Sequence, residues 1–285
     1  MISVILPVLN AARTLPDQLA ALAGQTFKGT WELLVADNGS TDAGPDLVRS
    51  WEVRLPLKFV DASGTPGGAA ARNLAATRAR GEVLACCDAD DVVDRGWLEA
   101  LEEATREHEF VAGALDYSAL NPHAPGWKRE MLARPTRWLG RIPFADSANL
   151  AVRKTAFNFV GGFDASLATV YDIDFSLRLL RAGHQLHFAP DAIVAKRMRR
   201  EVKAIWKQSV RWGKDDVVVY KRHRDAPSEA GGVRANGIDY LRNVASYVRK
   251  FPASLTSTGR VSWLEFAGRH YGRVQGSISE RTFLP

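Results

Sequence analysis

Residues 82–91 read Glu-Val-Leu-Ala-Cys-Cys-Asp-Ala-Asp-Asp, and this stretch decides the fold. Its first six residues form a short, largely apolar run, which predicts a buried strand over Glu82–Cys87. The strand runs directly into three carboxylates, those of Asp88, Asp90 and Asp91. Polar residues at the end of a buried strand are typical of α/β sheets, in which ligands bind outside the carboxyl ends of the strands.

Strands and helices alternate on both sides of this stretch. We expect strands at Ile2–Val8, Trp31–Ala36 and Leu57–Val60, and helices at Leu15–Leu22, Ala69–Arg80 and Gly96–His108. A further helix is expected to start at a Ser/Thr cap within Asp37–Asp42, and Asp94 is expected to cap the helix Gly96–His108. Short links between alternating elements predict a mostly parallel sheet with helices on both faces. Asn10, Asp37 and Asp88 then lie at neighbouring strand ends, which is the first indication of a binding site.

The second half of the chain shows a different pattern. Short segments rich in Pro, Gly and Trp follow Val111, and they are either a substrate-facing flap or surface loops (Pro122, Pro125, Trp127, Pro135, Trp138, Pro143). Helices are expected at Tyr171–Ala182, which Gly183 ends, and at the basic segment Val202–Val219, followed by a linker at Asp225–Gly232 and further helix to about Ser277. We therefore divide the chain into a domain over 1–224, with a donor half at 1–110 and an acceptor half at 111–224, and a linker with a C-terminal helical extension over 225–285.

Composition indicates a folded protein with an anionic partner. The net charge is +6, and Lys196–Arg224 holds eleven Lys or Arg residues against three Asp or Glu. Nucleic acid, phospholipid and nucleotide diphosphate all fit such a charge, and so does a solvated helix face. Because only bulk charge favours nucleic acid, we do not expect it as a partner.

The sequence also gives an expectation for cellular location. The apolar run Ile2–Leu9 is too short to cross a bilayer and lacks the features of a signal peptide. The two cysteines, Cys86 and Cys87, are adjacent, and neighbours in a strand point to opposite faces, so we expect buried, reduced thiols. These features predict a cytoplasmic protein, with peripheral contact at the inner face of the membrane as a further expectation.

The three aspartates are the first candidates for chemistry. Carboxylates so close together repel one another, so they are best tolerated beside a cation or in open solvent. Hard oxygen ligands suit Mg²⁺ or Mn²⁺, which often bind through one or two carboxylates and substrate phosphates. A solvated turn before the next helix is the alternative. The buried strand directly before Asp88 favours the functional interpretation.

Asp172 is the second candidate. A carboxylate at the start of a helix can act as a general base toward a hydroxyl. Thr169 and Asp172 also have the spacing of a capping box, and Asp174 and Arg178 that of an i,i+4 ion pair. From these residues alone the cap is the better interpretation.

Other polar residues give weaker signals. Arg211 could meet a diphosphate and Trp212 could stack on a sugar, although Ile205, Trp206, Val210 and Trp212 also form a plausible buried stripe. The Arg72-Asn73 pair could hold phosphate or lie at the surface. Without a ligand partner nearby in sequence, His184 and His187 are expected to be structural.

Taken together, these residues resemble the inverting family 2 glycosyltransferases, which have the GT-A fold. The resemblance runs from residue 2 to about residue 214. It rests on seven ordered motifs: Ser3–Asn10, Val35–Asp42, Ala71-Arg72-Asn73, Asp88–Asp91, Ala148–Arg153, Gly161–Asp164, and Tyr171-Asp172 with Arg178.

The resemblance implies roles for these positions. Pro7, Asn10 and Asp37 would surround the base and ribose of a nucleotide-sugar donor, and Arg72 and Ala89 would lie near it. Asp88 would contact the ribose or the water shell of the metal, and Asp90 would coordinate the divalent cation. Asp172 matches the catalytic base, which reverses the interpretation as a cap. Gln208, Arg211 and Trp212 are similar to an element near the diphosphate and acceptor.

Two positions depart from the family pattern. Tyr171 stands where Glu often precedes the base, a change that we expect to be tolerated. Many relatives place a metal-binding His at the end of the strand after Pro190, whereas this chain has Lys196. A protonated lysine cannot ligate a metal, so we expect Asp90 and donor oxygens to hold Mg²⁺ or Mn²⁺, with Lys196 replacing part of the ion's charge at the diphosphate.

The resemblance implies transfer of a sugar from a UDP or dTDP donor to a hydroxyl of a glycan, glycolipid or small molecule. A catalytically silent donor-binding or membrane-docking protein on the same fold is an alternative. A sugar-1-phosphate nucleotidyltransferase is another, although we expect a glycine-rich loop with Arg after its first strand, where this chain has Pro7-Val-Leu-Asn10.

Overall fold

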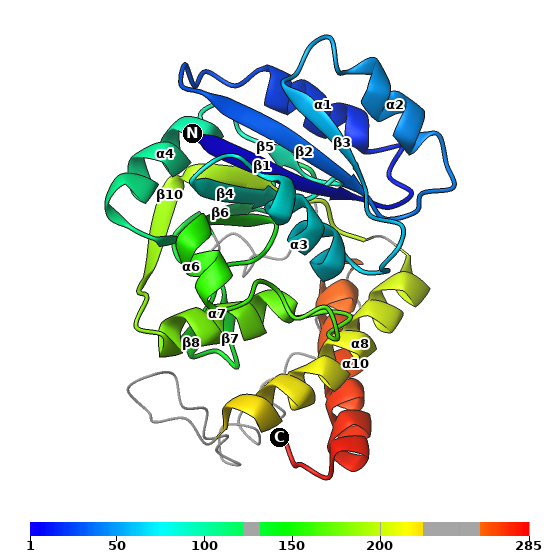
Figure 1. Cartoon of the computed structure of the whole chain (residues 1–285). Coiled ribbons are helices and arrows are strands. Elements are labelled where there is room, and N and C mark those ends of the chain that lie inside the picture. Colours follow the sequence, from blue (N-terminus) through cyan, green and yellow to red (C-terminus); the bar gives the residue numbers. More distant parts are fainter. Residues whose placement is uncertain (122–131, 200, 225–244, 246–256, 285) are drawn as a thin grey trace.

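The computed structural model describes residues 1–121, 132–199, 201–224, 245 and 257–284 (Figure 1). The predicted linker at Asp225–Gly232 and the flap residues Pro122, Pro125 and Trp127 lie outside these ranges. In chain order the elements are β1 (Ile2–Val8), α1 (Leu15–Ala23), β2 (Trp31–Asp37), α2 (Gly44–Ser50), β3 (Leu57–Asp61), α3 (Gly68–Arg78), β4 (Val83–Cys87), β5 (Val92–Val93), α4 (Trp97–Glu107), β6 (Phe110–Asp116), β7 (Arg137–Trp138), β8 (Ile142–Pro143), β9 (Asn149–Arg153), α6 (Lys154–Phe159), α7 (Tyr171–Arg181), β10 (Leu186–Ala195), α8 (Val202–His223) and α10 (Ser257–Glu280).

One sheet forms the centre of the molecule, with the strand order β3-β2-β1-β4-β9-β6-β10-β5. The pairs β3/β2, β2/β1 and β1/β4 are parallel, as expected. The pair β6/β10 is parallel too, although β6 was not predicted as a strand. Strand β9 was not predicted as a strand, and it lies antiparallel between β4 and β6. Because the chain reverses direction there, the segment before β9 reaches the edge of the sheet where β4 ends.

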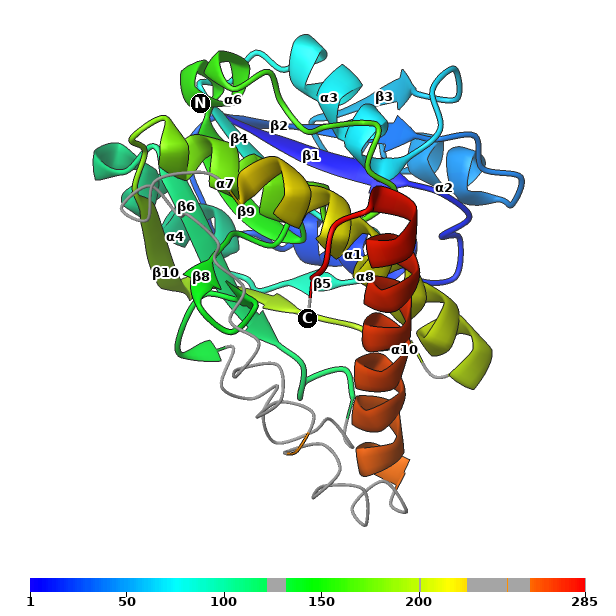
Figure 2. The same ribbon diagram turned by 90° about the horizontal axis from the view of Figure 1, so that it is seen from below.

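Helices cover both faces of the sheet (Figures 1 and 2). One face packs against α1, α2 and α4, and the other against α3, α6 and α7. Alternate residues of β1 point into these two cores: Val4 and Leu6 pack with α1, and Ile5 packs with α3. A strand buried on both faces has no polar face, which is why β1 is a nearly continuous apolar run.

The structure confirms the predicted helices and strands of the first half, with ends shifted by a few residues, but both predicted helix caps are wrong. The residue that precedes α2 is Ala43, and Ser40 and Thr41 bond to Asn10 instead. The residue that precedes α4 is Gly96, with Asp94 two positions earlier. Carboxylates nearby still bond to the helix starts: Asp42 accepts from the amide of Gly44, the first residue of α2, and Asp94 accepts from the amide of Gly96, just before α4.

The helices α8 and α10 lie side by side and in close contact, which confirms a helical C-terminal segment (Figure 2). Glycines permit this approach: a Cβ at Gly272 would lie 2.1 Å from the carbonyl oxygen of Val210, and one at Gly213 would lie 1.9 Å from that of Arg269. The predicted buried stripe of α8 is wrong at Trp206, which is 36% exposed. Helix α10 covers the neighbouring face of α8, where Ser209 and Gly213 are buried, and this leaves Trp206 at the edge of the contact.

A buried carboxylate connects these helices to the rest of the fold. Asp216 of α8 is fully buried and accepts hydrogen bonds from Trp138 Nε1 at 2.9 Å, from Arg269 Nε and Nη2 at 2.7 Å, and from Arg273 Nε at 2.9 Å. Burial raises the pKa of Asp216, but the two guanidinium groups outweigh it and lower that pKa to about 2. Asp216 thus joins α10 to the β7–β8 hairpin and is ionised at neutral pH.

Two further expectations can be compared with the structure. Cys86 and Cys87 are both buried and free, as predicted. Among the helices in the described parts of the chain, none is sufficiently long and apolar to cross a membrane.

Candidate functional site

The acidic loop lies at the carboxyl end of β4, as predicted. One oxygen from each of Asp88, Asp90 and Asp91 lies within 4.8 Å of the others. Gln18, a buried residue of α1, holds this loop: its Nε2 donates to the carbonyl oxygen of Asp88, and its Oε1 accepts from Val93 N, both at 3.0 Å. These two bonds fix the backbone at either side of the carboxylates.

Two cations contact the acidic loop directly. Arg72 of α3 is buried and pairs through Nη2 with Asp88 Oδ1. Lys196, which follows β10, places Nζ 3.2 Å from Asp88 Oδ2 and 2.9 Å from Asp91 Oδ2. The other oxygen of Asp91 accepts a bond from the backbone N–H of Arg197 at 2.8 Å. Asp90 is exposed, and its carboxylate forms no ion pair with a described residue.

The pKa values of Asp88 and Asp91 are shifted in opposite directions. Burial raises the pKa of Asp88, but Lys196 and Arg72 outweigh it and hold that pKa below its ordinary value. Burial raises the pKa of Asp91 to about 7, and the charge of Lys196 reduces the shift. Burial lowers the pKa of Lys196, but Asp91, Asp146 and Asp88 outweigh it and keep that pKa well above its ordinary value. Lys196 therefore carries a positive charge within the cluster.

The donor set of the loop fits a divalent cation. Three carboxylates offer hard oxygen ligands at close range, and Asp90 is exposed on the open side of the cluster. However, Lys196 already compensates Asp88 and Asp91, so a cation would be bound mainly by Asp90 and by oxygens from outside the protein.

The ends of β1 and β2 form the next part of the site. Asn10 has a positive φ of 51°, and its Oδ1 accepts bonds from the amide and hydroxyl of Thr41. Asp37 is buried; its Oδ2 accepts bonds from the amides of Gly39 and Ser40, and its Oδ1 has no hydrogen-bond partner within the described residues. A buried acceptor oxygen without a partner suits a ligand that carries N–H or O–H groups.

Asp172 lies in the first turn of α7. Its Oδ1 accepts from Ile173 N at 2.9 Å and its Oδ2 from Ser147 N at 3.1 Å. The predicted capping box is wrong, because Thr169 bonds to Asp215 of α8, at 2.7 Å through its amide and 2.8 Å through its hydroxyl, and Val170 is the cap residue. The predicted ion pair of Asp174 with Arg178 is present at 2.8 Å.

The environment of Asp172 suits a group that accepts a proton near neutral pH. Burial raises its pKa to about 7, and the nearby carboxylate of Asp146 adds to the shift. A general base works best when its pKa lies close to the working pH. Asp146 and Ser147 belong to the segment before β9, so the antiparallel strand brings both of them to Asp172.

Tyr171 connects Asp172 with the acidic loop. Its hydroxyl accepts a bond from Arg72 Nη1 at 2.8 Å, while Nη2 of the same guanidinium pairs with Asp88. One buried arginine therefore contacts both the loop and the residue next to Asp172. Arg72 and Tyr171 therefore connect the potential base, Asp172, to the acidic loop.

The sequence of the chain also matches known proteins. The profile described as glycosyl transferase family 2 matches residues 3–163. The chain belongs to glycosyl transferase family 2. Its glycosyltransferase activity follows from this membership, and the structures described next show the α/β fold of GT-A type.

Among curated proteins, the chain is 27% identical to glycosyltransferase AglE of Haloferax volcanii over 229 residues, 78% of this chain and 75% of that protein. It is also 27% identical to the pre-mycofactocin glycosyltransferase of Mycobacterium tuberculosis over 239 residues, 79% of this chain but 48% of that protein. The chain thus spans about half of the length of the mycobacterial relative.

Two solved structures show the same fold. The mannosyltransferase PcManGT of Pyrobaculum calidifontis, in complex with GDP-Man and Mn²⁺, has a TM-score of 0.70 at 20% identity, with 98% of this chain and 87% of that chain covered. S. aureus TarS 1–349, in complex with UDP-GlcNAc, has a TM-score of 0.53 at 17% identity, with 100% and 93% covered.

The remaining residues predicted for the site of this family 2 enzyme differ in their burial and their contacts. Pro7 is in β1, half-buried, and Ala89 is buried within the loop itself. Among the described residues, neither Gln208 nor Arg211 forms a hydrogen bond or ion pair with Asp88 or Asp172. Trp212 is half-buried, and the guanidinium of Arg269 lies 5.9 Å from the centre of its ring.

Other predicted residues support the fold. Asn73 bonds to the backbone of Phe163 through both its Nδ2 and its Oδ1. His184 pairs with Glu109 at 2.8 Å, and His187 stacks on His108 with ring centres 3.7 Å apart. These contacts agree with the structural role expected for both histidines.

Sequence reasoning missed several residues near the site. Gln18 stands on the apolar face of α1 among Leu15, Leu19 and Leu22, and a polar residue in such a stripe was the available signal. Asp146 precedes a strand that was not predicted. Arg269 belongs to helix α10, far along the chain, and its charge interacts most strongly with Asp216 and more weakly with Asp172. Neither has a signal in the local sequence.

Proposed function

We propose that this enzyme is an inverting glycosyltransferase that moves a sugar from a nucleotide-diphosphate sugar to an acceptor hydroxyl. The observation that carries the proposal is the buried Arg72, which contacts Asp88 of the acidic loop and Tyr171 beside Asp172. The complexes of PcManGT with GDP-Man and of TarS with UDP-GlcNAc support this class of donor. Of the nucleotides we favour UDP or dTDP, and of the sugars a hexose or deoxyhexose.

Asp172 performs the proton transfer in this proposal. As the acceptor oxygen attacks the anomeric carbon, its proton passes to the carboxylate of Asp172. The bond between that carbon and the diphosphate oxygen breaks on the opposite face, and the nucleoside diphosphate leaves with the electron pair. Attack from the opposite face inverts the configuration. The amides of Ile173 and Ser147 hold each carboxylate oxygen in place for this step.

The other predicted residues bind the donor and the acceptor. Pro7, Asn10 and Asp37 surround the base and ribose, with the unused oxygen of Asp37 as an acceptor. Arg72 and Ala89 lie beside the donor. Asp90, with Asp88, holds Mg²⁺ or Mn²⁺, which would stabilise charge on the leaving diphosphate.

The side of the site toward α8 serves the diphosphate and the acceptor. Lys196 contacts Asp88 of the acidic loop and carries a positive charge. Gln208, Arg211 and Trp212 belong to α8, and the ring of Trp212 could stack on a sugar face. The acceptor that binds here is a glycan, a glycolipid or a small molecule.

A donor panel tests the proposal. We expect hydrolysis of one nucleotide sugar from a set of UDP, dTDP and GDP donors in the presence of Mg²⁺ or Mn²⁺, measured as free nucleoside diphosphate. Reaction products from an added acceptor are expected to show the inverted anomeric configuration by NMR. Donor binding without any turnover would favour a silent binding protein, and release of pyrophosphate from a nucleoside triphosphate and sugar phosphate would favour a nucleotidyltransferase.

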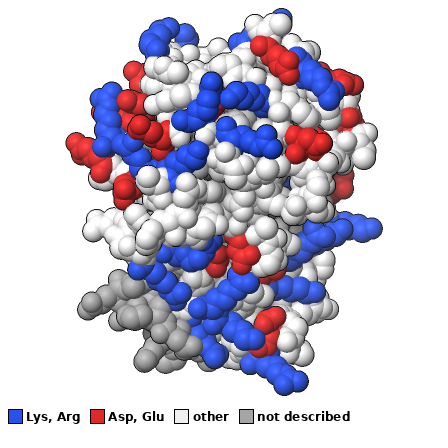
Figure 3. All heavy atoms as spheres, in the orientation of Figure 1, with Lys and Arg blue, Asp and Glu red and all other residues white. Residues whose placement is uncertain are grey.

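We also propose a peripheral contact with an anionic membrane through α8 and α10. Lys203, Lys207 and Lys214 are exposed on one face of α8. In Figure 3, Lys and Arg predominate over the lower part of the surface, where Figure 1 places these helices. Exposed apolar side chains on α10 accompany them, Tyr271 at 50% and Ile278 at 75% exposure. Basic and apolar side chains on adjoining faces suit the headgroup region of a bilayer.

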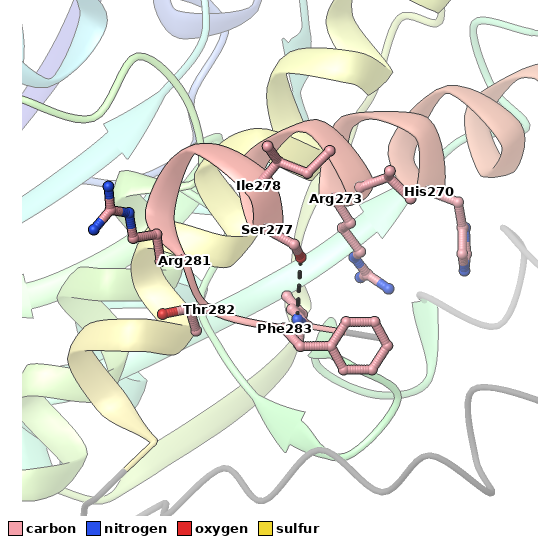
Figure 4. Close-up of a pocket in the computed structure, with 9 residues that line it drawn as sticks. His270, Arg273, Ser277, Ile278, Arg281, Thr282 and Phe283 are labelled. Atoms are coloured by element: carbon pink, nitrogen blue, oxygen red, sulfur yellow. Dashed lines mark hydrogen bonds between the residues drawn. The ribbon is translucent and has the colours of Figure 1, made fainter.

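The end of α10 adds to this surface. The chain turns back after the helix, and Leu284 N donates to Ser277 Oγ at 3.2 Å (Figure 4). This turn leaves Phe283 73% exposed at a pocket of about 460 Å³, which Phe283 lines together with Arg281 and Ile278. Cations and apolar groups therefore extend to the last turn of α10.

Vesicle sedimentation tests the membrane contact. Replacing Lys203, Lys207 and Lys214 with Gln is expected to weaken binding to vesicles rich in phosphatidylserine by about a hundredfold, since each charge near the surface contributes about 1 kcal/mol. High salt should release the wild-type protein. The matched control replaces three exposed cations elsewhere, Lys28, Arg54 and Arg95, and should bind like wild type. Absence of binding by wild type at any salt concentration would refute the contact.

A further inference from the structure

Lys196 follows β10 and contacts two of the three carboxylates of the acidic loop. Its Nζ lies 2.9 Å from Asp91 Oδ2 and 3.2 Å from Asp88 Oδ2, and these oxygens belong to the three-carboxylate cluster that could hold a cation. The side chain of Lys196 is 16% exposed and that of Asp91 is 1% exposed. Two of the three carboxylates are thus already compensated by a charge that belongs to the chain.

The position of Lys196 is fixed by the sheet. It follows β10 directly, and its backbone N–H donates to the carbonyl oxygen of Asp116 at 2.8 Å. Its carbonyl oxygen accepts a bond from Asn121 Nδ2 at 2.7 Å. Both the N–H and the carbonyl group of Lys196 are therefore hydrogen-bonded, so its backbone is fixed beside the acidic loop.

We propose that Lys196 is a built-in cation of the acidic loop that competes with divalent metal for Asp88 and Asp91. A metal ion that used these oxygens would have to displace the ammonium group or share the carboxylates with it, and two positive charges so close together repel each other. The intact protein should therefore bind Mn²⁺ weakly before the donor arrives, through Asp90. This inference deepens the proposed function, since it concerns the same diphosphate site.

The test is Mn²⁺ binding to the full-length protein without donor, measured by electron paramagnetic resonance of free Mn²⁺. We expect Lys196→Met to bind Mn²⁺ at least about tenfold more tightly than wild type, because removal of the ammonium leaves Asp91 without an ion-pair partner among the described residues and Asp88 with Arg72 alone. Lys196→Arg keeps the charge and should remain weak. Equal affinity of Lys196→Met and wild type would overturn the proposal.

Arg197→Met is the matched control. The Arg197 side chain carries the same charge next to the loop, but it donates to the carbonyl oxygen of Asp90 and to Asp17, and contacts none of the three carboxylates of the cluster. We expect a change in Mn²⁺ affinity of less than about threefold for this variant, because its charge is further from the oxygens and more exposed to screening. An equal gain in both variants would mean that only net charge matters, which would also overturn the proposal.

Thermal melting covers the case in which Lys196→Met is unstable. If uncompensated carboxylates destabilise the variant, MnCl₂ should restore its melting temperature, since a ligand that binds the folded state stabilises it. A destabilised variant that Mn²⁺ does not rescue would contradict the exchange of one cation for another. These measurements need no donor, so they stand even if the donor panel shows no transfer.

Discussion

Asp172→Asn is expected to lower turnover by about 10²–10⁴-fold, the contribution typical of a well-placed general base. The single amide oxygen of Asn can accept only one of the two bonds from Ile173 N and Ser147 N, because the amide nitrogen is a donor, so a thermal melt should accompany the kinetics to show that the variant is folded. Donor affinity should remain close to that of wild type, because the acidic loop and Arg72 are unchanged. Steady-state kinetics and calorimetric donor binding measure the two effects separately. Turnover close to wild type would remove Asp172 from the mechanism.

The pH profile gives a second measure of the same group. Because burial and Asp146 raise the pKa of Asp172 to about 7, kcat/KM should rise with pH up to about 7 and then level off. Asp146→Asn removes one source of this shift, so the rise should move to lower pH. An unchanged profile in Asp146→Asn would assign the titration to another group.

Asp216→Ala is expected to destabilise the protein by about 3–5 kcal/mol, the usual cost of removing one partner of a buried ion pair. Trp138, Arg269 and Arg273 would lose their shared acceptor, and α10 would lose its link to the β7–β8 hairpin. Urea unfolding measures the change, and limited proteolysis should cut near α10 first.

Two further measurements decide whether burial explains the effect. Glu280→Gln breaks the exposed pair with Lys221 between the same helices, and we expect it to cost less than about 1 kcal/mol. The pKa of Asp216, about 2, lies below its ordinary value of 3.8, so its stabilisation is complete above about pH 4 and is lost as pH falls toward 2. That loss amounts to about 2 kcal/mol and should be absent in Asp216→Ala. Equal stability of Asp216→Ala and wild type would contradict the role of this carboxylate.

The sequence predicted the first half of the fold well, because local patterns determine it. The apolar runs Ile2–Val8 and Val83–Cys87 are strands buried on both faces, and such strands are recognisable without tertiary information. The polar residues Asn10, Asp37 and Asp88 lie at the ends of their strands or within two residues of them, so the parallel order of β2, β1 and β4 brings them to one edge.

The caps could not be predicted in the same way. Ser40, Thr41 and Thr169 have residue types that favour helix starts, but each finds a partner in another segment. A local propensity of about 1 kcal/mol is easily outweighed when a side chain reaches a tertiary partner. The same applies to Trp206, whose burial depended on where α10 lies against α8.

The sequence by itself determined that three carboxylates follow a buried strand, and that Asp172 begins a helix. Only the tertiary structure decided what surrounds them. Asp88 and Asp91 contact Lys196, which is more than a hundred residues away, and Asp172 contacts Ser147, which an antiparallel strand brings to it. The physical reason is that charge and burial, which set the pKa and the cation affinity of these groups, come from residues that are distant along the chain.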